Sequence, residues 1–278
     1  MLKKKKIVSG VVNLRGHDFK ISVLKKNLTN KKKNLVLAEA YGSDKIKKLN
    51  WYQKGYDIID VFSKSEHLKN TKKINKYLAK ILKIKKKKSF NVINYHKFIN
   101  DKNHLEIVKQ TRNLDPQVFK SIKKKIFLKI FNKYEISFKK NKILGKEVAI
   151  LRLNRPGGIK DLNPPHRDGY LNYWAKSLNI WYMISGSFNS CSLPIVPKSH
   201  LYNEKYLTVT KPRCFMNGIK YNVPTILKIT GKKKIFFKIP KLKPGQVLVF
   251  SPFLIHGFGY NFSKKKTRSA LEFRPMVS

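Results

Sequence analysis

The sequence predicts an α+β protein with a mainly β core, in which N-terminal helices buttress a barrel made of two sheets. Apolar residues recur at helical spacing as far as about residue 135, and that periodicity then stops. From about residue 146, short strand-like runs alternate with turns, which is typical of a sandwich or barrel. The length of 278 residues suits one large domain with a single core.

The first 50 residues are the least informative part of the chain. Their short apolar runs, separated by turns rich in Lys and Asn, suggest a few short strands at residues 7–14, 21–24 and 35–40. We expect residues 1–50 to form an N-terminal extension, whether integrated into the fold or of unknown role, and residues 51–278 to form the main domain.

A strand over residues 55–62 precedes the first predicted helix, for which Ser63 or Ser65 is a suitable N-cap. The apolar face of this helix consists of Leu68, Ile74, Tyr77, Leu78, Ile81 and Leu82. A second helix is expected within residues 93–110.

A third helix begins at Asp115 and Pro116, with Asp as the cap and Pro in the first turn, and ends near Glu135. Its apolar face consists of Phe119, Ile122, Ile126, Ile130 and Tyr134. The strands expected after it are residues 147–153, 178–184, 192–196, 226–229, 234–239, 247–251 and 269–274.

The formal net charge of +47 invites a nucleic-acid interpretation, but the kind of cation argues against it. Only eight of the 62 basic residues are Arg, and Lys occurs in runs along the whole chain. Proteins that read bases or clamp phosphates depend on the bidentate guanidinium. We interpret the lysines as surface positions that have shifted toward Lys codons, as an A/T-rich genome favours. We expect no specific nucleic acid partner. Their positive field still favours an anionic small-molecule substrate.

Other classes are excluded by composition. No apolar stretch is long enough to span a bilayer, and the run after the N-terminal lysines is too short for a secretory signal. Two cysteines, Cys191 and Cys214, cannot form a disulfide framework. We therefore expect a cytoplasmic protein.

A possible metal site lies in the β-rich half. In a strand, residues two apart point to the same face, so His166 and Asp168 can converge while Arg167 points away. These two residues supply two-thirds of a facial triad of two histidines and one carboxylate, which leaves open positions on Fe(II).

The best third ligand is His256, which ends the apolar run that starts at residue 247. Arg268 opens the next strand-like run, and its guanidinium suits a dicarboxylate held by the metal. As alternatives, His166 and Asp168 could form a solvated turn, His256 could be a structural histidine, and Arg268 could be a further surface cation.

Over about residues 55–275, the sequence resembles the phytanoyl-CoA dioxygenase branch of the Fe(II)- and 2-oxoglutarate-dependent oxygenases, which includes ectoine hydroxylases. The resemblance rests on the strand at 55–62 with its helix, Arg152-Leu153-Asn154, His166-Arg167-Asp168, the loop 193–200, and the run 244–250 leading to His256, Asn261 and Arg268. Lys198 stands where the family usually has glycine, a departure that concerns the turn and not the metal site.

The resemblance implies a double-stranded β-helix, also called a jelly-roll or cupin-like fold, with Fe(II) at one mouth. His166, Asp168 and His256 would ligate the metal, and Arg268 would pair with the 5-carboxylate of 2-oxoglutarate. The implied activity is a hydroxylation that consumes O2 and releases succinate and CO2. A catalytically silent jelly-roll that binds a ligand, and a nucleic-acid-binding protein, are the alternatives.

Other pocket residues are expected with less support. By analogy with ectoine hydroxylases, Asn154 would touch the cosubstrate, and Arg152 a substrate carboxylate or the cosubstrate. Asn179 and Trp181 share one face of their predicted strand and could also line the site. Arg152 and Asn154 could instead be structural, Trp181 could be core, and Arg274 is the fallback for the cosubstrate role.

Overall fold

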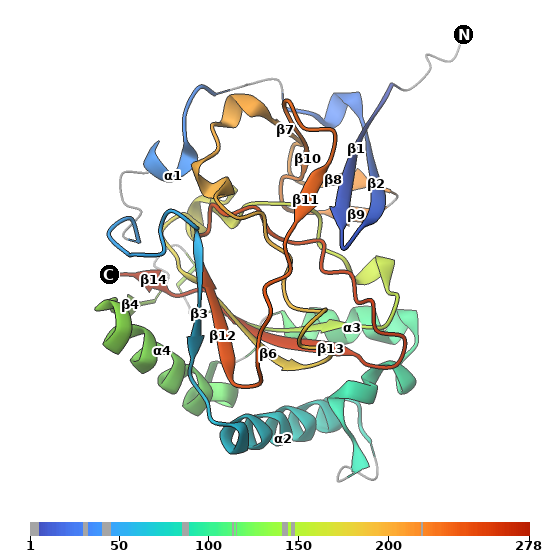
Figure 1. The fold of residues 1–278 in the computed structure, drawn as a ribbon. Helices are drawn as coiled ribbons and strands as arrows, with labels where there is room; N and C mark the ends of the chain where they lie inside the picture. The colour runs from blue at the N-terminus through green and yellow to red at the C-terminus, as the bar shows by residue number, and fades with distance from the viewer. Residues whose placement is uncertain are drawn as a thin grey trace.

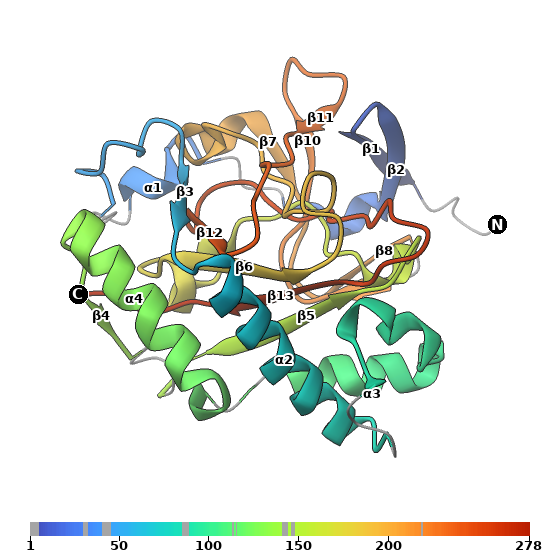
Figure 2. The same ribbon diagram turned by 60° about the horizontal axis from the view of Figure 1, so that its bottom comes forward.

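The computed structural model describes residues 6–29, 33–40, 46–84, 89–112, 114, 116–140, 144–145, 148–217 and 219–278. Figures 1 and 2 show three layers: helices on one side, a large sheet in the middle and smaller strands beyond it.

The middle layer is a five-stranded antiparallel sheet in the order β3-β12-β6-β13-β5. Its strands are β3 (Tyr56–Asp60), β5 (Ala149–Asn154), β6 (Asn179–Ser185), β12 (Gln246–Phe250) and β13 (Arg268–Phe273). Each lies within two residues of a strand expected from the sequence.

The facing layer is held by single antiparallel bridges. His166 bridges His256, His256 bridges Ile195, and Ile195 bridges Lys238. Along the chain, segments therefore alternate between the layers in the order β5, His166, β6, Ile195, β12, His256 and β13. This alternation defines a double-stranded β-helix and confirms the predicted fold class. The run 192–196, expected as a strand, contributes only the bridging residue Ile195.

Several short strands extend the facing layer. The main-chain N–H of Ile226 donates to Pro165 O, which joins β10 (Ile226–Ile229) and its partner β7 (Leu207–Val209) to the metal-site segment. The hairpin of β8 (Cys214–Met216) and β9 (Ile219–Tyr221) follows β7. β4 (Phe138–Lys139) pairs with β14 (Met276–Val277) at the C-terminus.

The N-terminal segment is part of the same sheet system. β1 (Ile7–Leu14) forms a hairpin with β2 (His17–Leu24) and pairs in parallel with β11 (Ile235–Phe237). The expectation of a strand at 35–40 is wrong, because Leu37–Ala40 forms the short helix α1. Its residues Leu, Ala and Glu are strong helix formers, and Leu37 and Ala38 pack against Ala175 and Phe253.

The helices cover the outer face of the large sheet (Figure 2). They are α2 (Lys64–Ile81), α3 (Asp101–Thr111) and α4 (Lys120–Tyr134). Ser63 caps α2 in a capping box with Glu66, as one of the two predicted caps. The expected second helix is divided into a 3-10 segment at Val92–Lys97 and α3.

The third predicted helix starts later than expected. Pro116–Phe119 is a 3-10 turn, and α4 runs from Lys120 until Glu135 ends it with a φ of 57°. The predicted cap Asp115 lies outside the described residues.

The strand alternation sorts side chains between two cores. On β6, Ile180, Tyr182 and Ile184 pack against the helices, whereas Trp181 and Met183 face the interior of the barrel. The same alternation places Arg152, Asn154, Arg268 and Glu272 on the inner face, where polar side chains surround the site.

Candidate metal centre

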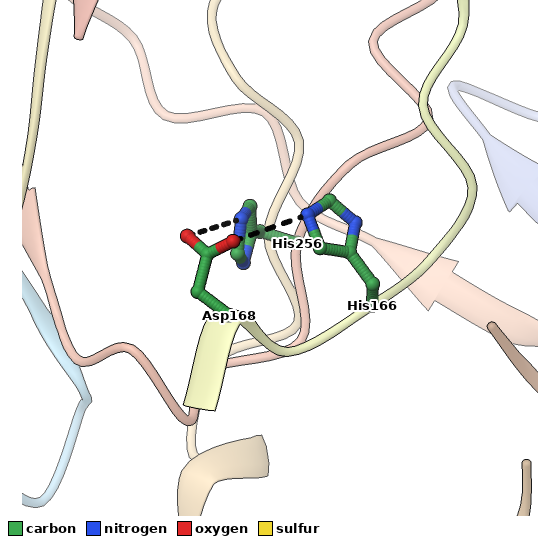
Figure 3. Close-up of side chains that lie close together, drawn as sticks. All are labelled: His166, Asp168 and His256. Carbon is green, nitrogen blue, oxygen red and sulfur yellow. Dashed lines mark ion pairs between the residues drawn. The ribbon is translucent and has the colours of Figure 1, made fainter. Parts of the chain in front are cut away.

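His166 and His256 are held side by side by their own main chains. The N–H of each donates to the carbonyl of the other at 3.0 Å, which makes a single antiparallel pair. The two imidazole rings lie 4.3 Å apart between centroids and are both buried. Figure 3 shows Asp168 pointing toward the same spot.

The three predicted ligands converge. Nε2 of His166 lies 3.6 Å from Asp168 Oδ1, and Nε2 of His256 lies 3.4 Å from Asp168 Oδ2. Within the described part of the chain, these residues form a cluster whose ligand atoms all lie within 4.8 Å of one another. Arg167 points away, as expected, and forms a buried ion pair with Glu204.

The hydrogen bonds of both rings leave Nε2 free for a metal ion. His166 Nδ1 lies 2.7 Å from Pro164 O, and His256 Nδ1 lies 2.9 Å from Leu254 O. A carbonyl only accepts, so each Nδ1 carries the proton and each neutral ring turns its Nε2 lone pair toward Asp168. Lone pairs facing a carboxylate at more than hydrogen-bond length repel, and a cation between them removes the repulsion.

Asp168 is held ionised. Its Oδ2 accepts from Asn179 Nδ2 at 2.8 Å and lies 3.2 Å from Arg274 Nη2. Burial opposes ionisation, but the positive charge of Arg274 and the other contacts of the carboxylate outweigh it and hold the pKa of Asp168 well below its usual range. An anionic carboxylate beside two neutral imidazoles is the donor set of a facial triad, so the residues fit Fe(II).

Arg268 is a buried guanidinium without an acidic partner. Its Nη2 donates to Asn154 Oδ1 at 2.5 Å, from the directly opposed position on β5, and its Nη1 donates to Cys191 O at 3.2 Å. Among the described residues, no carboxylate lies within 4.0 Å of it. Burial lowers the pKa of Arg268 to about 10, which leaves it charged at neutral pH. An uncompensated buried cation of this kind favours an anionic ligand.

The other two arginines of this face already have carboxylate partners. Arg152 Nη2 lies 3.0 Å from Glu272 Oε2, and Arg274 Nη2 lies 3.4 Å from the same oxygen. Burial raises the pKa of Glu272, but the charges of Arg152 and Arg274 outweigh it and the net shift is downward. Arg274 is also tied to Asp168, so it is a poorer candidate for the cosubstrate than Arg268.

A cavity of about 310 Å³ joins these groups. Six predicted residues line it: His166, His256, Arg268, Asn154, Arg152 and Trp181. The Trp181 ring lies 6.0 Å from the Arg268 guanidinium carbon, and Asn179 contacts Asp168.

Sequence reasoning missed three residues of this region. Glu272 was recognisable, since it follows Arg268 by four residues and so lies on the same strand face. His104 and Asp161 also line the cavity, with His104 Nε2 3.1 Å from Asp161 Oδ1. Asp161 in turn supports Asn154, whose Nδ2 donates to Asp161 O at 2.8 Å. No sequence spacing links His104 to Asp161.

The loop in which Lys198 replaces the family's glycine keeps the turn that glycine favours. Lys198 has a φ of 65°, in the left-handed region. The turn buries Ser199, whose hydroxyl accepts from the main-chain N–H of Ile255 at 2.7 Å. The loop thereby supports the segment that ends at His256.

No family model matches the chain, and no curated protein matches it. Solved structures do: EctD from S. alaskensis, crystallised with 2-oxoglutarate and 5-hydroxyectoine, has a TM-score of 0.44 at 12% identity over 99% of this chain and 85% of that one. Prolyl-4-hydroxylase from Pseudomonas putida has a TM-score of 0.37 at 11% identity over 82% and 96%. AviO1 from Streptomyces viridochromogenes has 0.44 at 11% over 89% and 96%.

These TM-scores lie below 0.5, so the likeness is loose. The fold class and the metal site are assigned from the geometry of this chain. That geometry is a double-stranded β-helix with a His-x-Asp and a distant His converging inside it. Among the described residues, no helix is long and apolar enough to cross a membrane.

Proposed function

We propose that this protein is an Fe(II)- and 2-oxoglutarate-dependent oxygenase that hydroxylates a small anionic organic substrate. One observation carries the proposal: both histidines of the facial triad line the same cavity as Arg268, a buried arginine with no carboxylate partner among the described residues. The triad supplies three ligands, and Arg268 supplies a charge that suits the far carboxylate of a dicarboxylate bound at the metal.

His166, Asp168 and His256 would hold the iron. Bound Fe(II) supplies the chemistry that couples the splitting of 2-oxoglutarate, with O2, into succinate and CO2 to the conversion of a substrate C–H bond into C–OH. Pro164 O and Leu254 O keep both Nδ1 atoms protonated, and Asn179 fixes Asp168, so the three donor atoms are oriented before the metal arrives.

Arg268 would bind the 5-carboxylate of 2-oxoglutarate. Asn154 and the carbonyl of Cys191 hold the guanidinium in place, and the Trp181 ring lies beside it. Burial removes competing water, which strengthens the pairing of guanidinium with carboxylate. Asn154 supports this role as a positioning residue.

Anaerobic titration with Fe(II) or Mn(II), followed by 2-oxoglutarate and a succinate assay in air, tests the proposal. The double variant His166→Ala with Asp168→Ala should lose metal binding and succinate formation. The matched control is His17→Ala with Asp18→Ala, a neighbouring His/Asp pair of β2 whose residues are exposed. Iron binding that survives the first double variant would overturn the site assignment.

The same titration separates the two alternatives. A silent binding jelly-roll would take up neither metal nor 2-oxoglutarate. A nucleic-acid-binding protein would bind oligonucleotides with a steep salt dependence that the triad variants leave unchanged.

A further inference from the structure

The lining of the cavity is rich in arginine, although lysine is the common basic residue in the rest of the sequence. Four of the eight arginines line the cavity, against two of the 54 lysines. These arginines are Arg112, Arg152, Arg268 and Arg274. Arginine recognises oxyanions through its planar fork of donors, so this concentration points to an anionic ligand in addition to the cosubstrate.

Arg112 has no acidic partner. It follows the last residue of α3, reaches solvent and lines the same cavity as the triad. Among the described residues, no carboxylate lies within ion-pair distance of it. Partial burial and then the charge of Arg152 lower its pKa, against a smaller rise from the charge of Glu272, so the two guanidinium groups repel each other. An anion between them would relieve that repulsion.

Arg152 has a donor to spare. Its Nη2 is paired with Glu272, but its buried Nε has no hydrogen-bond partner. A buried donor without an acceptor is costly. Because this Nε is closed to solvent, a ligand oxygen would reach it after a shift of the Arg152 side chain, which is 20% exposed. Lys220 of β9 lines the cavity as well and is exposed, with no carboxylate near it in the described chain. Lys109, the other lining lysine, is already bonded to Glu106 at 2.8 Å.

We propose that Arg112, Arg152 and Lys220 form an anion subsite at the mouth of the cavity, and that this subsite binds a phosphoryl group of the substrate. Arg112 and Lys220 contribute two positive charges with no carboxylate of the described chain at ion-pair distance, and a phosphomonoester carries about 1.5 to 2 negative charges at pH 7. A monocarboxylate would neutralise only one of them. That the anion belongs to the substrate rests on the proposed oxygenase function, whereas the binding of the anion does not.

The subsite is distinct from the cosubstrate position. Arg268 is fully enclosed at the inner end, next to the triad and Trp181, whereas Arg112 and Lys220 reach solvent. A substrate anchored by its phosphoryl group at the mouth would extend its carbon chain inward past Arg152 toward His166 and His256.

The test is a calorimetric titration of the full-length, metal-free Arg268→Gln variant with inorganic phosphate, malonate and acetate, because in the unmodified chain Arg268 would offer these anions a second site. About 150 mM chloride screens weak binding to surface lysines. Arg112→Gln should weaken phosphate binding about tenfold, the loss expected for one charge-assisted hydrogen bond. Arg213→Gln in the same background should leave it unchanged, because it removes an exposed arginine that does not line the cavity.

Phosphate should bind more tightly than malonate, and both more tightly than acetate. Unchanged phosphate affinity when Arg112→Gln is added to the Arg268→Gln chain would overturn the subsite. Malonate binding more tightly than phosphate would overturn the phosphoryl assignment. Because no metal is present, these outcomes are independent of the iron titration, so either proposal can fail without the other.

Discussion

His166 and His256 form a reciprocal main-chain pair, each donating its N–H to the other's carbonyl at 3.0 Å, although 90 residues separate them in the chain. The pair brings both rings to the same side of the facing layer, and the two-residue spacing adds Asp168. The metal centre is therefore built on main-chain hydrogen bonds, and its precision depends on side chains that orient the ligands.

Asn179→Ala should weaken metal binding roughly 10- to 100-fold, because Asn179 donates to Asp168 Oδ2 and fixes the carboxylate. The measurement is a Mn(II) dissociation constant under anaerobic conditions. Asn70→Ala is the matched control, since Asn70 is also a buried amide but bonds to Tyr182 on the helix side of the sheet. Equal losses in both variants would show that Asn179 acts only through stability.

Gly259→Ala should weaken 2-oxoglutarate binding about tenfold while metal affinity stays the same. A Cβ at Gly259 would come within 2.5 Å of Arg268 Nη1 and displace that flexible end. The displaced guanidinium loses a charge-assisted bond to the carboxylate. Calorimetry on the Mn(II)-loaded protein gives both constants.

Gly231→Ala serves as the control for glycine replacement: its φ of 78° strains the backbone, but a Cβ there meets nothing within 4 Å, so 2-oxoglutarate affinity should not change. If Gly259→Ala binds 2-oxoglutarate normally, Arg268 is not the residue that holds it.

Lys198→Gly should stabilise the fold by about 1 kcal/mol, because Lys198 occupies the left-handed region at a φ of 65°. Urea unfolding measures the free energy of unfolding. Lys198→Ala keeps a Cβ, and with it the strain, so its free energy of unfolding should stay close to that of the unmodified chain. A stabilisation of similar size in Lys198→Ala would contradict the strain argument.

His200 should make stability pH-dependent on the acid side. Burial lowers its pKa to about 4, whereas an unfolded histidine titrates near 6.5. Above pH 6.5 both states are neutral and this group contributes no slope. As the pH falls from 6.5 toward 4, only the unfolded state takes up the proton, so the free energy of unfolding decreases by up to about 1.4 kcal/mol per pH unit.

His200→Phe should remove that share of the slope, because Phe cannot be protonated and keeps a ring against Tyr52, where the two centroids lie 5.0 Å apart. Denaturant unfolding between pH 4.5 and 7.5, about the range over which the two states differ, measures it. An identical slope in both proteins would show that His200 is protonated in the folded chain.

Much of the fold was predictable because its signals are local. Ser63 with Glu66 three residues later is a capping box, and α2 begins there. Alternating apolar residues placed β6, β12 and β13 to within two residues. The prediction for 35–40 was wrong because it considered only the apolar content of the run, whereas the Leu, Ala and Glu of residues 37–40 all favour a helix.

The sequence by itself determined the identity of the candidate ligands and the fold class, because two-residue and four-residue spacings fix which side chains share a face. Only the tertiary structure decided which arginine is free. Among the described residues, Arg152 and Arg274 pair with Glu272, whereas Arg268 bonds to neutral groups and Arg112 has no carboxylate at ion-pair distance. A guanidinium is charged because of its own chemistry. Whether a carboxylate pairs with it depends on strands and helices that are distant in the sequence and meet only when the chain folds.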